Sequence, residues 1–211
     1  MTYRIALIGD SIFDNANYVP GERCVTDQLN SELGDGSEVS LLAVDGDFVR
    51  DVGKQLGRLP AHVTHVIVSV GGNNALSYAQ ELLSDYDNAS EMFDEWARIR
   101  KEFRHEYCEM LRLVVALGLN VTVCTIYDAV PSIDDGEATG LTIFNDVIIS
   151  EAIGAGVPLV DLRQVCTEMD DYSRLSPVEP SSQGGAKIAA VLSCMLKEHD
   201  FTSGKTVVYT S

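Results

Sequence analysis

Residues 3–15 read YRIALIGDSIFDN, an apolar run that ends abruptly in a Gly-Asp-Ser turn. Such a run, closed by a glycine, is typical of a β-strand that is covered on both faces. Four further apolar runs end near Gly, Asp or Asn residues: EVSLLAV at 38–44, THVIVSV at 64–70, NVTVCTIY at 120–127 and VPLVDL at 157–162. The sequence therefore predicts a parallel sheet of five strands.

The segments between these runs carry apolar side chains at three- and four-residue spacing, the pattern of a helix with one buried face. They lie at about 22–33, 47–57, 90–117, 141–154 and 182–198. Alternating strands and helices with right-handed connections give a three-layer α/β/α sandwich, and we expect the flavodoxin-like strand order 2-1-3-4-5. Ligands of such folds bind at the carboxyl ends of the strands.

The domain organisation follows from what the sequence lacks. Residues 1–200 contain no repeat, low-complexity segment or linker that divides them, so we expect a single domain followed by a C-terminal tail at 201–211. The stretch at 74–90 is the longest irregular candidate and could cover a binding site. For the tail, both an added edge strand and disorder remain open.

Composition restricts the partners and the compartment. The 211 residues have a formal net charge of -17 with no basic run, which repels phosphate backbones and anionic membranes, so we expect neither nucleic acid nor a membrane as partner. The five scattered cysteines contain no C-x-x-C pair and favour a reducing compartment. With no signal-peptide pattern and no apolar stretch of roughly 20 residues, a cytoplasmic location is expected. The oligomeric state is not predicted.

Three strand ends carry residues that could serve one reaction site. Ser11 follows the first strand, Gly46 the second and Asn73 the third. A serine between a strand and a helix presents its hydroxyl to the crevice, where backbone N–H groups can stabilise an oxyanion. Taken singly, however, such a serine or glycine is also an ordinary turn residue.

Together these positions resemble, in order, the first three sequence blocks of the SGNH (GDSL-type) hydrolases: Gly-Asp-Ser at 9–11, then Gly46, then Gly71 with Asn73 and Asn74. The resemblance spans the chain and implies the SGNH hydrolase fold and cleavage of esters. It also implies Ser11 as nucleophile, an oxyanion hole made by the N–H groups of Ser11 and Gly46 with the Asn73 amide, and no cofactor or metal.

The last motif departs from that family. Its Asp-x-x-His, which supplies the base and the residue that orients it, is replaced by S-P-V-E, with Ser176 at the aspartate position and Glu179 at the histidine position. A glutamate with a reference pKa of about 4.3 is a weak base near neutral pH unless burial raises its pKa. Glu179 is therefore either the base or a carboxylate that accepts backbone N–H bonds at the start of the last helix.

The four histidines are poor substitutes for the missing base. His62 and His65 stand at the start of the third strand, and an extended segment puts His65 about 25 Å from Asn73. His105 lies within a long predicted helix, and His199 follows the last helix. We expect none of them to act on Ser11.

Other carboxylates gather at the same edge of the predicted sheet: Asp10, Asp14, Asp45, Asp47, Asp128 and Asp161. Most are typical turn or N-cap residues. Their clustering also permits a site for Mg²⁺ or another hard cation, although no spacing is diagnostic of a metal. We expect Asp14, Asn15, Asn74 and Tyr127 to line the substrate pocket.

The sequence thus predicts a serine-dependent hydrolase of small acyl or acetyl esters, in which Glu179, or a water that it orients, accepts the serine proton. The alternative is a catalytically degenerate relative that uses the crevice to bind an acyl or carbohydrate ligand. Loss of the usual base and its orienting residue favours the alternative, whereas retention of Ser11, Gly46 and Asn73 favours the enzyme.

Overall fold

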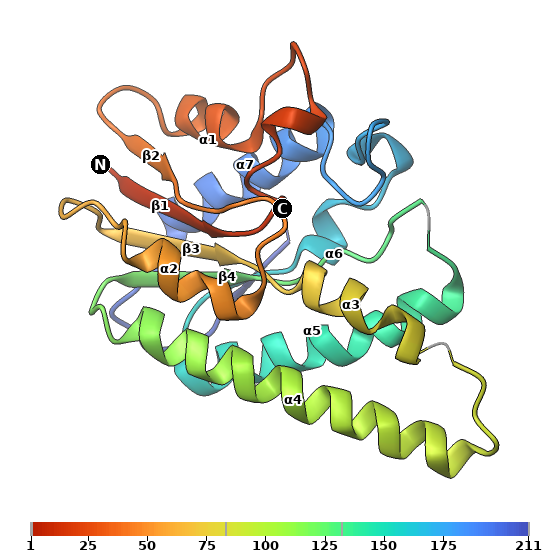
Figure 1. Ribbon diagram of the computed structural model, residues 1–211. Coiled ribbons are helices and arrows are strands. Elements are labelled where there is room, and N and C mark those ends of the chain that lie inside the picture. Colours follow the sequence, from red (N-terminus) through yellow and green to blue (C-terminus); the bar gives the residue numbers. More distant parts are fainter. Residues whose placement is uncertain (1, 83, 132, 211) are drawn as a thin grey trace.

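The computed structural model describes residues 2–82, 84–131 and 133–210. In this part of the chain, six parallel strands form one sheet in the order β2-β1-β3-β4-β5-β6 (Figure 1). They are β1 (Arg4–Gly9), β2 (Glu38–Leu41), β3 (His65–Ser69), β4 (Asn120–Cys124), β5 (Leu159–Val160) and β6 (Val208–Tyr209). The order predicted for the first five strands is confirmed.

The sixth strand comes from the C-terminal tail. The N–H of Leu159 donates to the carbonyl of Val207 at 3.0 Å, and the N–H of Asp161 donates to the carbonyl of Tyr209 at 2.9 Å. These bonds attach β6 in parallel to β5. Of the two possibilities left open for the tail, residues 208–209 therefore form an edge strand, and residue 211 lies outside the described part.

Helices cover both faces of the sheet, as the predicted sandwich requires. One face carries α1 (Val25–Leu33) and α7 (Ser182–Glu198), and the other carries α2 (Val52–Leu56), α4 (Ala89–Val115) and α5 (Asp135–Ala155) (Figure 1). The connections contain α6 (Leu162–Val165) and the 3-10 helices η1 (Ala16–Tyr18), η2 (Val49–Asp51) and η3 (Met169–Asp171). No helix in the described ranges combines the length and apolar character of a membrane span.

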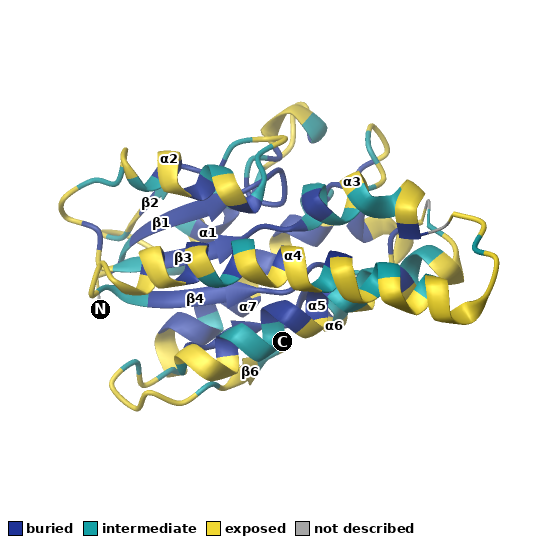
Figure 2. Ribbon diagram, turned by 60° about the horizontal axis from the view of Figure 1, so that its bottom comes forward, coloured by how far each residue is buried: buried dark blue, intermediate teal, exposed yellow. Residues whose placement is uncertain are grey.

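The core is divided by the sheet, because successive residues of a strand point to opposite faces. In β1, Ile5 and Leu7 belong to the cluster beneath α1 and α7, whereas Ala6 and Ile8 belong to the cluster beneath α4 and α5. Figure 2 shows buried residues concentrated in the strands and on the helix sides that face them. This two-sided burial explains why the strands read as continuous apolar runs.

Two helices differ from the sequence prediction. The stretch expected to be irregular at 74–90 is largely covered by α3 (Gly72–Leu82), and residue 83 lies outside the described part. The Gly-Gly-Asn-Asn opening has low helix propensity, but packing of this segment on α4 and α5 overrides it. Helix α5 begins well before residue 141, because Asp134 caps it and Glu137 completes a capping box.

The end of β1 is shaped by Gly9. Its φ of 136° lies in the region that favours glycine, and a Cβ at this position would lie 1.7 Å from the carbonyl oxygen of Ser69 on β3. The buried amide of Gln55 accepts from the Gly9 N–H at 2.8 Å and donates to its carbonyl at 2.7 Å. These contacts fix the direction in which the chain leaves the sheet.

We expect Gly9→Ala to lower the free energy of unfolding by about 3 kcal/mol or more, because the added methyl must displace the backbone of β3 and the conformation is strained for alanine. Urea denaturation followed by circular dichroism measures the change. Gly53→Ala is the matched control, since a Cβ there meets nothing within 4 Å. It should change stability by less than about 1 kcal/mol, and similar small effects of both substitutions would contradict the prediction.

Candidate active site

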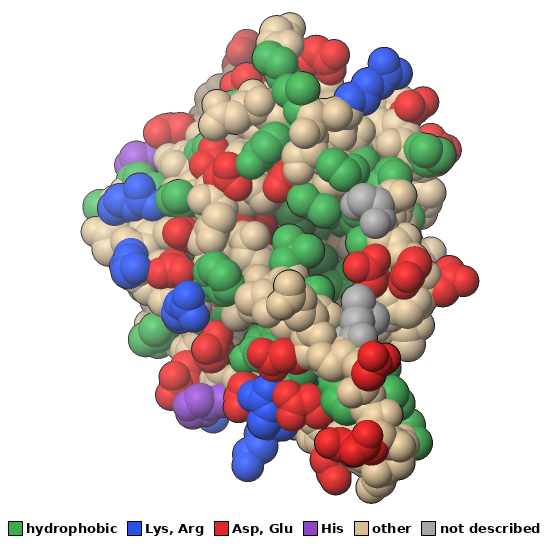
Figure 3. Space-filling model, turned by 45° about the vertical axis from the view of Figure 1, so that its right-hand side comes forward, with side chains coloured by type: hydrophobic (Ala, Val, Ile, Leu, Met, Phe, Trp, Pro, Cys, Tyr) green, Lys and Arg blue, Asp and Glu red, His purple; other side chains and the backbone are tan. Residues whose placement is uncertain are grey.

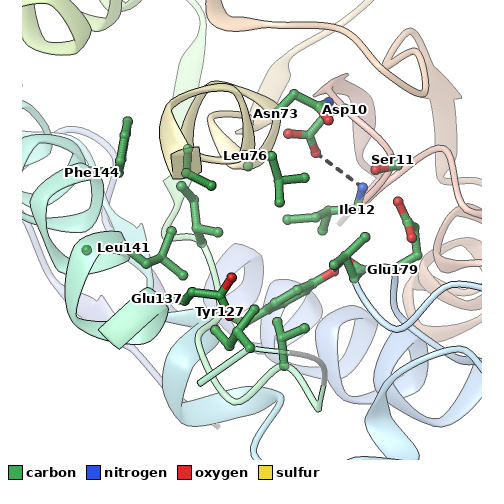
Figure 4. A pocket seen from close by; sticks show the side chains of 18 of the residues that line it. Asp10, Ser11, Ile12, Asn73, Leu76, Tyr127, Glu137, Leu141, Phe144 and Glu179 are labelled. Atoms are coloured by element: carbon green, nitrogen blue, oxygen red, sulfur yellow. Dashed lines mark hydrogen bonds between the residues drawn. The ribbon is translucent and has the colours of Figure 1, made fainter. Parts of the chain in front are cut away.

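A cavity opens between α3 and α5 at the edge where the carboxyl ends of β1, β3 and β4 meet. Figure 3 shows hydrophobic side chains gathered around a hollow on this face, with acidic side chains around them. Most of the lining is apolar: Ile12, Ala75, Leu76, Ala79, Leu82, Ile126, Val130, Ile133, Leu141, Phe144 and Val178. Asp10, Ser11, Asn73 and Glu179 lie at one end of it, and Leu141 and Phe144 at the other (Figure 4).

Ser11 follows β1 in a tight turn. The N–H groups of Phe13 and Asp14 both donate to the carbonyl of Asp10, at 3.2 and 3.1 Å, and so close the turn. Ser11 is 8% exposed and lines the cavity. Its own N–H has no acceptor among the described residues. The turn therefore presents both a hydroxyl and a free N–H donor beside the cavity.

Asn73 lies in the first turn of α3 and lines the same end of the cavity. One N–H of its amide donates to the carbonyl of Asp47 at 2.9 Å, which leaves the second N–H for a ligand. Asp47 follows Gly46, which has a φ of 83° and whose N–H has no acceptor in the described part of the chain. Gly46 is not among the lining residues, but the bond from Asn73 holds its turn next to the cavity.

Two amide side chains tie these loops together. Gln55, which holds Gly9, also donates to Oδ2 of Asp47 at 2.8 Å. Asn74 accepts from the N–H of Val49 at 3.1 Å and donates to Glu106 at 3.2 Å. Asn74 was expected in the substrate pocket, but its amide is used in these contacts and it is not among the lining residues. Gln55 was missed because its partners are distant in sequence.

Glu179 lies in the loop before α7. It is 6% exposed and lines the cavity, and Figure 4 shows its carboxylate turned toward Ser11. Its N–H donates to the carbonyl of Ser176 at 3.1 Å, and its carbonyl accepts from the N–H of Ser173 at 2.8 Å, so the backbone of this loop is held on both sides. Oε2 of Glu179 is buried and has no hydrogen-bond partner among the described residues.

The start of α7 has its own cap. The side chain of Ser181 accepts from the N–H of Gly184 at 3.1 Å, and its hydroxyl donates to the carbonyl of Asp170. Ser181 thus fills the N-cap position, which is one of the two roles that the sequence leaves open for Glu179. The Glu179 side chain is directed into the cavity instead.

Asn15 connects the segment of Ser11 to the segment of Glu179. It is fully buried, donates to the carbonyl of Pro180 at 3.0 Å and accepts from the N–H of Val25 at 3.0 Å. Oδ2 of Asp14 accepts from the N–H of Asp45 at 3.0 Å. Neither Asn15 nor Asp14 is among the lining residues. Their contacts support the loops around the cavity.

Tyr127, at the end of β4, does line the cavity. Its hydroxyl donates to the carbonyl of Val178 at 2.7 Å, one residue before Glu179. Burial raises the pKa of Tyr127 well above its usual value, so the phenol stays neutral at physiological pH. The side chain therefore holds the Glu179 loop in place without adding charge to the cavity.

Asp10, interpreted from the sequence as a turn former, belongs to the cavity. It is 2% exposed, and its Oδ1 accepts from the N–H of Ile12 at 3.2 Å. Its Oδ2 is buried without a hydrogen-bond partner in the described part of the chain. Burial raises the pKa of Asp10 to about 7, against the opposing effect of nearby backbone N–H groups and with a small contribution from the charge of Glu179.

Among the described residues, none that lines the cavity is a histidine. Each of the four histidines has contacts elsewhere: His62 with Glu38 at 3.3 Å, His65 with Thr64 at 2.8 Å and Asn120 at 3.0 Å, His105 with Glu109 at 3.6 Å and His199 with Tyr209 at 3.2 Å. The imidazole expected in a serine hydrolase is therefore not supplied to Ser11 by any of them.

Two of the other predicted carboxylates at this edge have protein partners. Asp161 accepts from the Thr125 hydroxyl at 2.9 Å and from the Arg163 guanidinium at 2.6 and 2.7 Å. Asp45 accepts from the Tyr18 hydroxyl at 2.7 Å. Within the described ranges, no group of three or more His, Cys, Asp and Glu side chains is placed to hold a metal ion.

Comparisons with known proteins support this fold. A family model described as "GDSL-like Lipase/Acylhydrolase family" matches residues 7–186. No curated protein matches the sequence. Similar solved structures include the lipase/acylhydrolase from Enterococcus faecalis, with TM-score 0.66, 16% identity and coverage of 93% of this chain and 96% of that chain.

Two further structures are similar. One is the acetyl xylan esterase AlAXEase, with TM-score 0.65, 15% identity and coverage of 93% of this chain and 100% of that chain. The other is phospholipase A1 from Streptomyces albidoflavus NA297, with TM-score 0.64, 15% identity and coverage of 92% of this chain and 99% of that chain. These structures confirm the predicted α/β/α fold.

Proposed function

Because the chain belongs to the GDSL-like lipase/acylhydrolase family, we propose that it is a serine-dependent hydrolase of small acyl or acetyl esters. Ser11 is the nucleophile and Glu179, or a water that it orients, is the base. The N–H groups of Ser11 and Gly46 hold the oxyanion together with the Asn73 amide. The observation that carries the proposal is that Ser11, Asn73 and Glu179 line the same end of one cavity.

The chemistry follows from these positions. The Ser11 oxygen forms a bond with the ester carbonyl carbon while its proton passes to the Glu179 carboxylate, and the carbonyl electron pair moves onto the oxygen. The three donors stabilise this oxyanion. When the bond to the alcohol breaks, Glu179 returns the proton to the leaving oxygen. Water then releases the acyl group by the same steps.

The apolar part of the cavity suits the acyl group. Leu141 and Phe144 lie at the end away from Ser11, and Leu76 lies between the two ends (Figure 4). The described part of the lining contains no lysine or arginine that could bind a phosphate or carboxylate. The similar structures include an acetyl xylan esterase and a phospholipase A1, so the fold alone does not select among esters. The proposed reaction uses no cofactor.

The test is reaction with a fluorophosphonate probe followed by peptide mass spectrometry, together with hydrolysis of p-nitrophenyl acetate and p-nitrophenyl butyrate. Modification at Ser11 and release of p-nitrophenol support the hydrolase. If neither occurs between pH 5 and pH 9, roughly the range over which a carboxylate or an imidazole would be deprotonated, the hydrolase is excluded. The absence of an imidazole in the lining would then favour a protein that binds an acyl or carbohydrate ligand.

We expect Asn73→Ala to lower kcat by about 100-fold with little change in KM, because a donor that acts on the oxyanion is lost. Steady-state hydrolysis of p-nitrophenyl acetate measures both constants. Urea denaturation serves as the control: loss of the single bond to Asp47 should lower stability by only about 1 kcal/mol. An unchanged kcat would remove Asn73 from the oxyanion hole.

A further inference from the structure

Two buried carboxyl groups face the cavity at the end that contains Ser11. Asp10 is 2% exposed and Glu179 is 6% exposed, and both line the cavity. In each of them one side-chain oxygen, Oδ2 of Asp10 and Oε2 of Glu179, is buried without a hydrogen-bond partner among the described residues. The serine chemistry described above uses only Glu179 and leaves Asp10 without a role.

A buried carboxylate oxygen without a hydrogen-bond partner is costly, and a second negative charge nearby raises that cost. No lysine, arginine or histidine stands among the lining residues that the structure describes, so neither charge is offset there. Two such groups in one cavity therefore resist simultaneous ionisation, and over a range of pH one of them holds a proton.

The surroundings of Asp10 favour the protonated form. The titratable groups near it are Glu179 from the loop before α7, whose charge raises the pKa of Asp10, and Tyr127 after β4 and Cys124 within β4, whose own pKa values the charge of Asp10 raises. None of them carries a positive charge. Burial is the largest influence and raises the pKa of Asp10 to about 7, outweighing the backbone N–H groups of Ile12, Gly71 and Gly72, which lie near the carboxyl and lower its pKa.

We propose that Asp10 is a further catalytic residue, which keeps its proton and donates a hydrogen bond from its carboxyl group to the carbonyl oxygen of the ester held beside Ser11. The role rests on the proposed hydrolase function. A protonated carboxyl in an apolar site is a strong hydrogen-bond donor, and two carboxyl groups whose surroundings differ can divide the roles of acid and base.

The steps balance without a co-reactant. As the bond from Ser11 to the carbonyl carbon forms, the serine proton moves to Glu179 and negative charge develops on the carbonyl oxygen. Asp10 donates a hydrogen bond to that oxygen but retains its proton. When the alcohol leaves, it takes the proton from Glu179, and Asp10 is unchanged at the end of each half-reaction.

The protonation of Asp10 is tested directly by carbon NMR of the whole chain labelled at the aspartate carboxyl carbon. The expected result is one aspartate with an apparent pKa of about 7, absent from Asp10→Asn and present in Asp35→Asn, an exposed control that removes the same charge. In Glu179→Gln this titration should move to lower pH, because a negative neighbour is removed. If every aspartate titrates below about pH 5, the proposal is overturned.

Stability provides a readout that does not depend on activity. The pKa of Asp10 is raised from 3.8 to about 7 on folding, so the folded chain binds more protons than the unfolded chain between these values. The stabilisation from this protonation is complete below pH 3.8 and is lost as pH rises through 7. The urea midpoint of the wild type should therefore fall more steeply than that of Asp10→Asn across this window, and parallel profiles would contradict the proposal.

The pH dependence of kcat/KM distinguishes a catalytic hydrogen-bond donor at Asp10 from a buried carboxyl group that has no part in the reaction. In the wild type, kcat/KM should fall about tenfold per pH unit above pH 7 as Asp10 loses its proton. Asp10→Asn keeps an N–H donor but cannot titrate, so this alkaline limb should disappear. Asp10→Leu, which has no donor, should be about 100-fold slower at every pH.

Persistence of the alkaline limb in Asp10→Asn overturns the catalytic role of Asp10. A chain that shows the NMR titration but is never modified at Ser11 refutes the hydrolase itself, while its carboxyl titration still establishes that Asp10 is protonated. The failure of the inference and the failure of the proposed function are therefore distinguishable.

Discussion

Ser11→Ala is expected to lower the hydrolysis of p-nitrophenyl acetate by about 10⁴-fold or more, because Ser11 is the one serine or threonine among the described lining residues, and the Tyr127 hydroxyl is bound to the Val178 carbonyl. Modification by a fluorophosphonate should disappear completely. The measurement is steady-state turnover with enzyme concentrations high enough to detect a residual rate. Removal of a small, 8% exposed hydroxyl should leave the fold intact.

Ser193→Ala is the matched control. Ser193 lies in α7, is 2% exposed and has a hydroxyl without a partner among the described residues, but it is not part of the cavity lining. Turnover of this variant should stay within about twofold of the wild type, since surface and packing changes away from the site are small. If Ser11→Ala retained a tenth or more of the activity, water activated by a carboxylate, and not the serine, would be the nucleophile.

The sequence predicts the location of the site because the fold places its motifs together. The first and third apolar runs are strands that pair side by side, with Gly9 opposite Ser69. Parallel strands end at the same edge of a sheet, so Ser11 and Asn73, which follow those ends, must lie near each other. The order of the strands and the spacing of the motifs thus suffice to predict the edge at which the cavity opens.

Sequence patterns of this kind do not predict which side chains contact residues that are far away in the sequence. Nothing local in the sequence indicates that Gln55 holds both backbone groups of Gly9, or that Asn15 reaches Pro180 across 165 positions. The burial of Asp10 is equally hidden, because the same Gly-Asp-Ser turn could leave its carboxyl in solvent. In the structure, the turn after Gly9, whose φ is 136°, directs this carboxyl into the interior.

The cavity was the part of the site least visible in the sequence. Its wall is formed by α3, where Ala75, Leu76, Ala79 and Leu82 line the pocket. Their helical spacing is the signal that was available, but the glycine and asparagine residues before it indicate a loop. The sequence therefore indicates polar residues such as Asp14 and Asn15 as the lining, whereas in the structure their side chains are bound to backbone groups.

Glu179→Gln is expected to lower kcat by about 1,000-fold with KM nearly unchanged, because the amide keeps the size of the side chain but cannot accept the serine proton. The loss should be larger for an alkyl ester than for a p-nitrophenyl ester, since only the alkyl alcohol needs the proton that Glu179 returns. Comparing ethyl butyrate with p-nitrophenyl butyrate in the two proteins measures this difference.

Glu198→Gln removes the same charge at the far end of α7 and is the control for a general electrostatic effect. It should leave both substrates unaffected, because exposed charges at that separation are largely screened at physiological salt. If Glu179→Gln turned over both esters at the wild-type rate, Glu179 would have no part in proton transfer, and Asp10 would be the remaining carboxyl in the lining beside Ser11. The pH dependence of activity then distinguishes the two roles of Asp10. If Asp10 is the base, activity rises with pH through about 7, whereas if Asp10 is a protonated donor, activity falls over the same range.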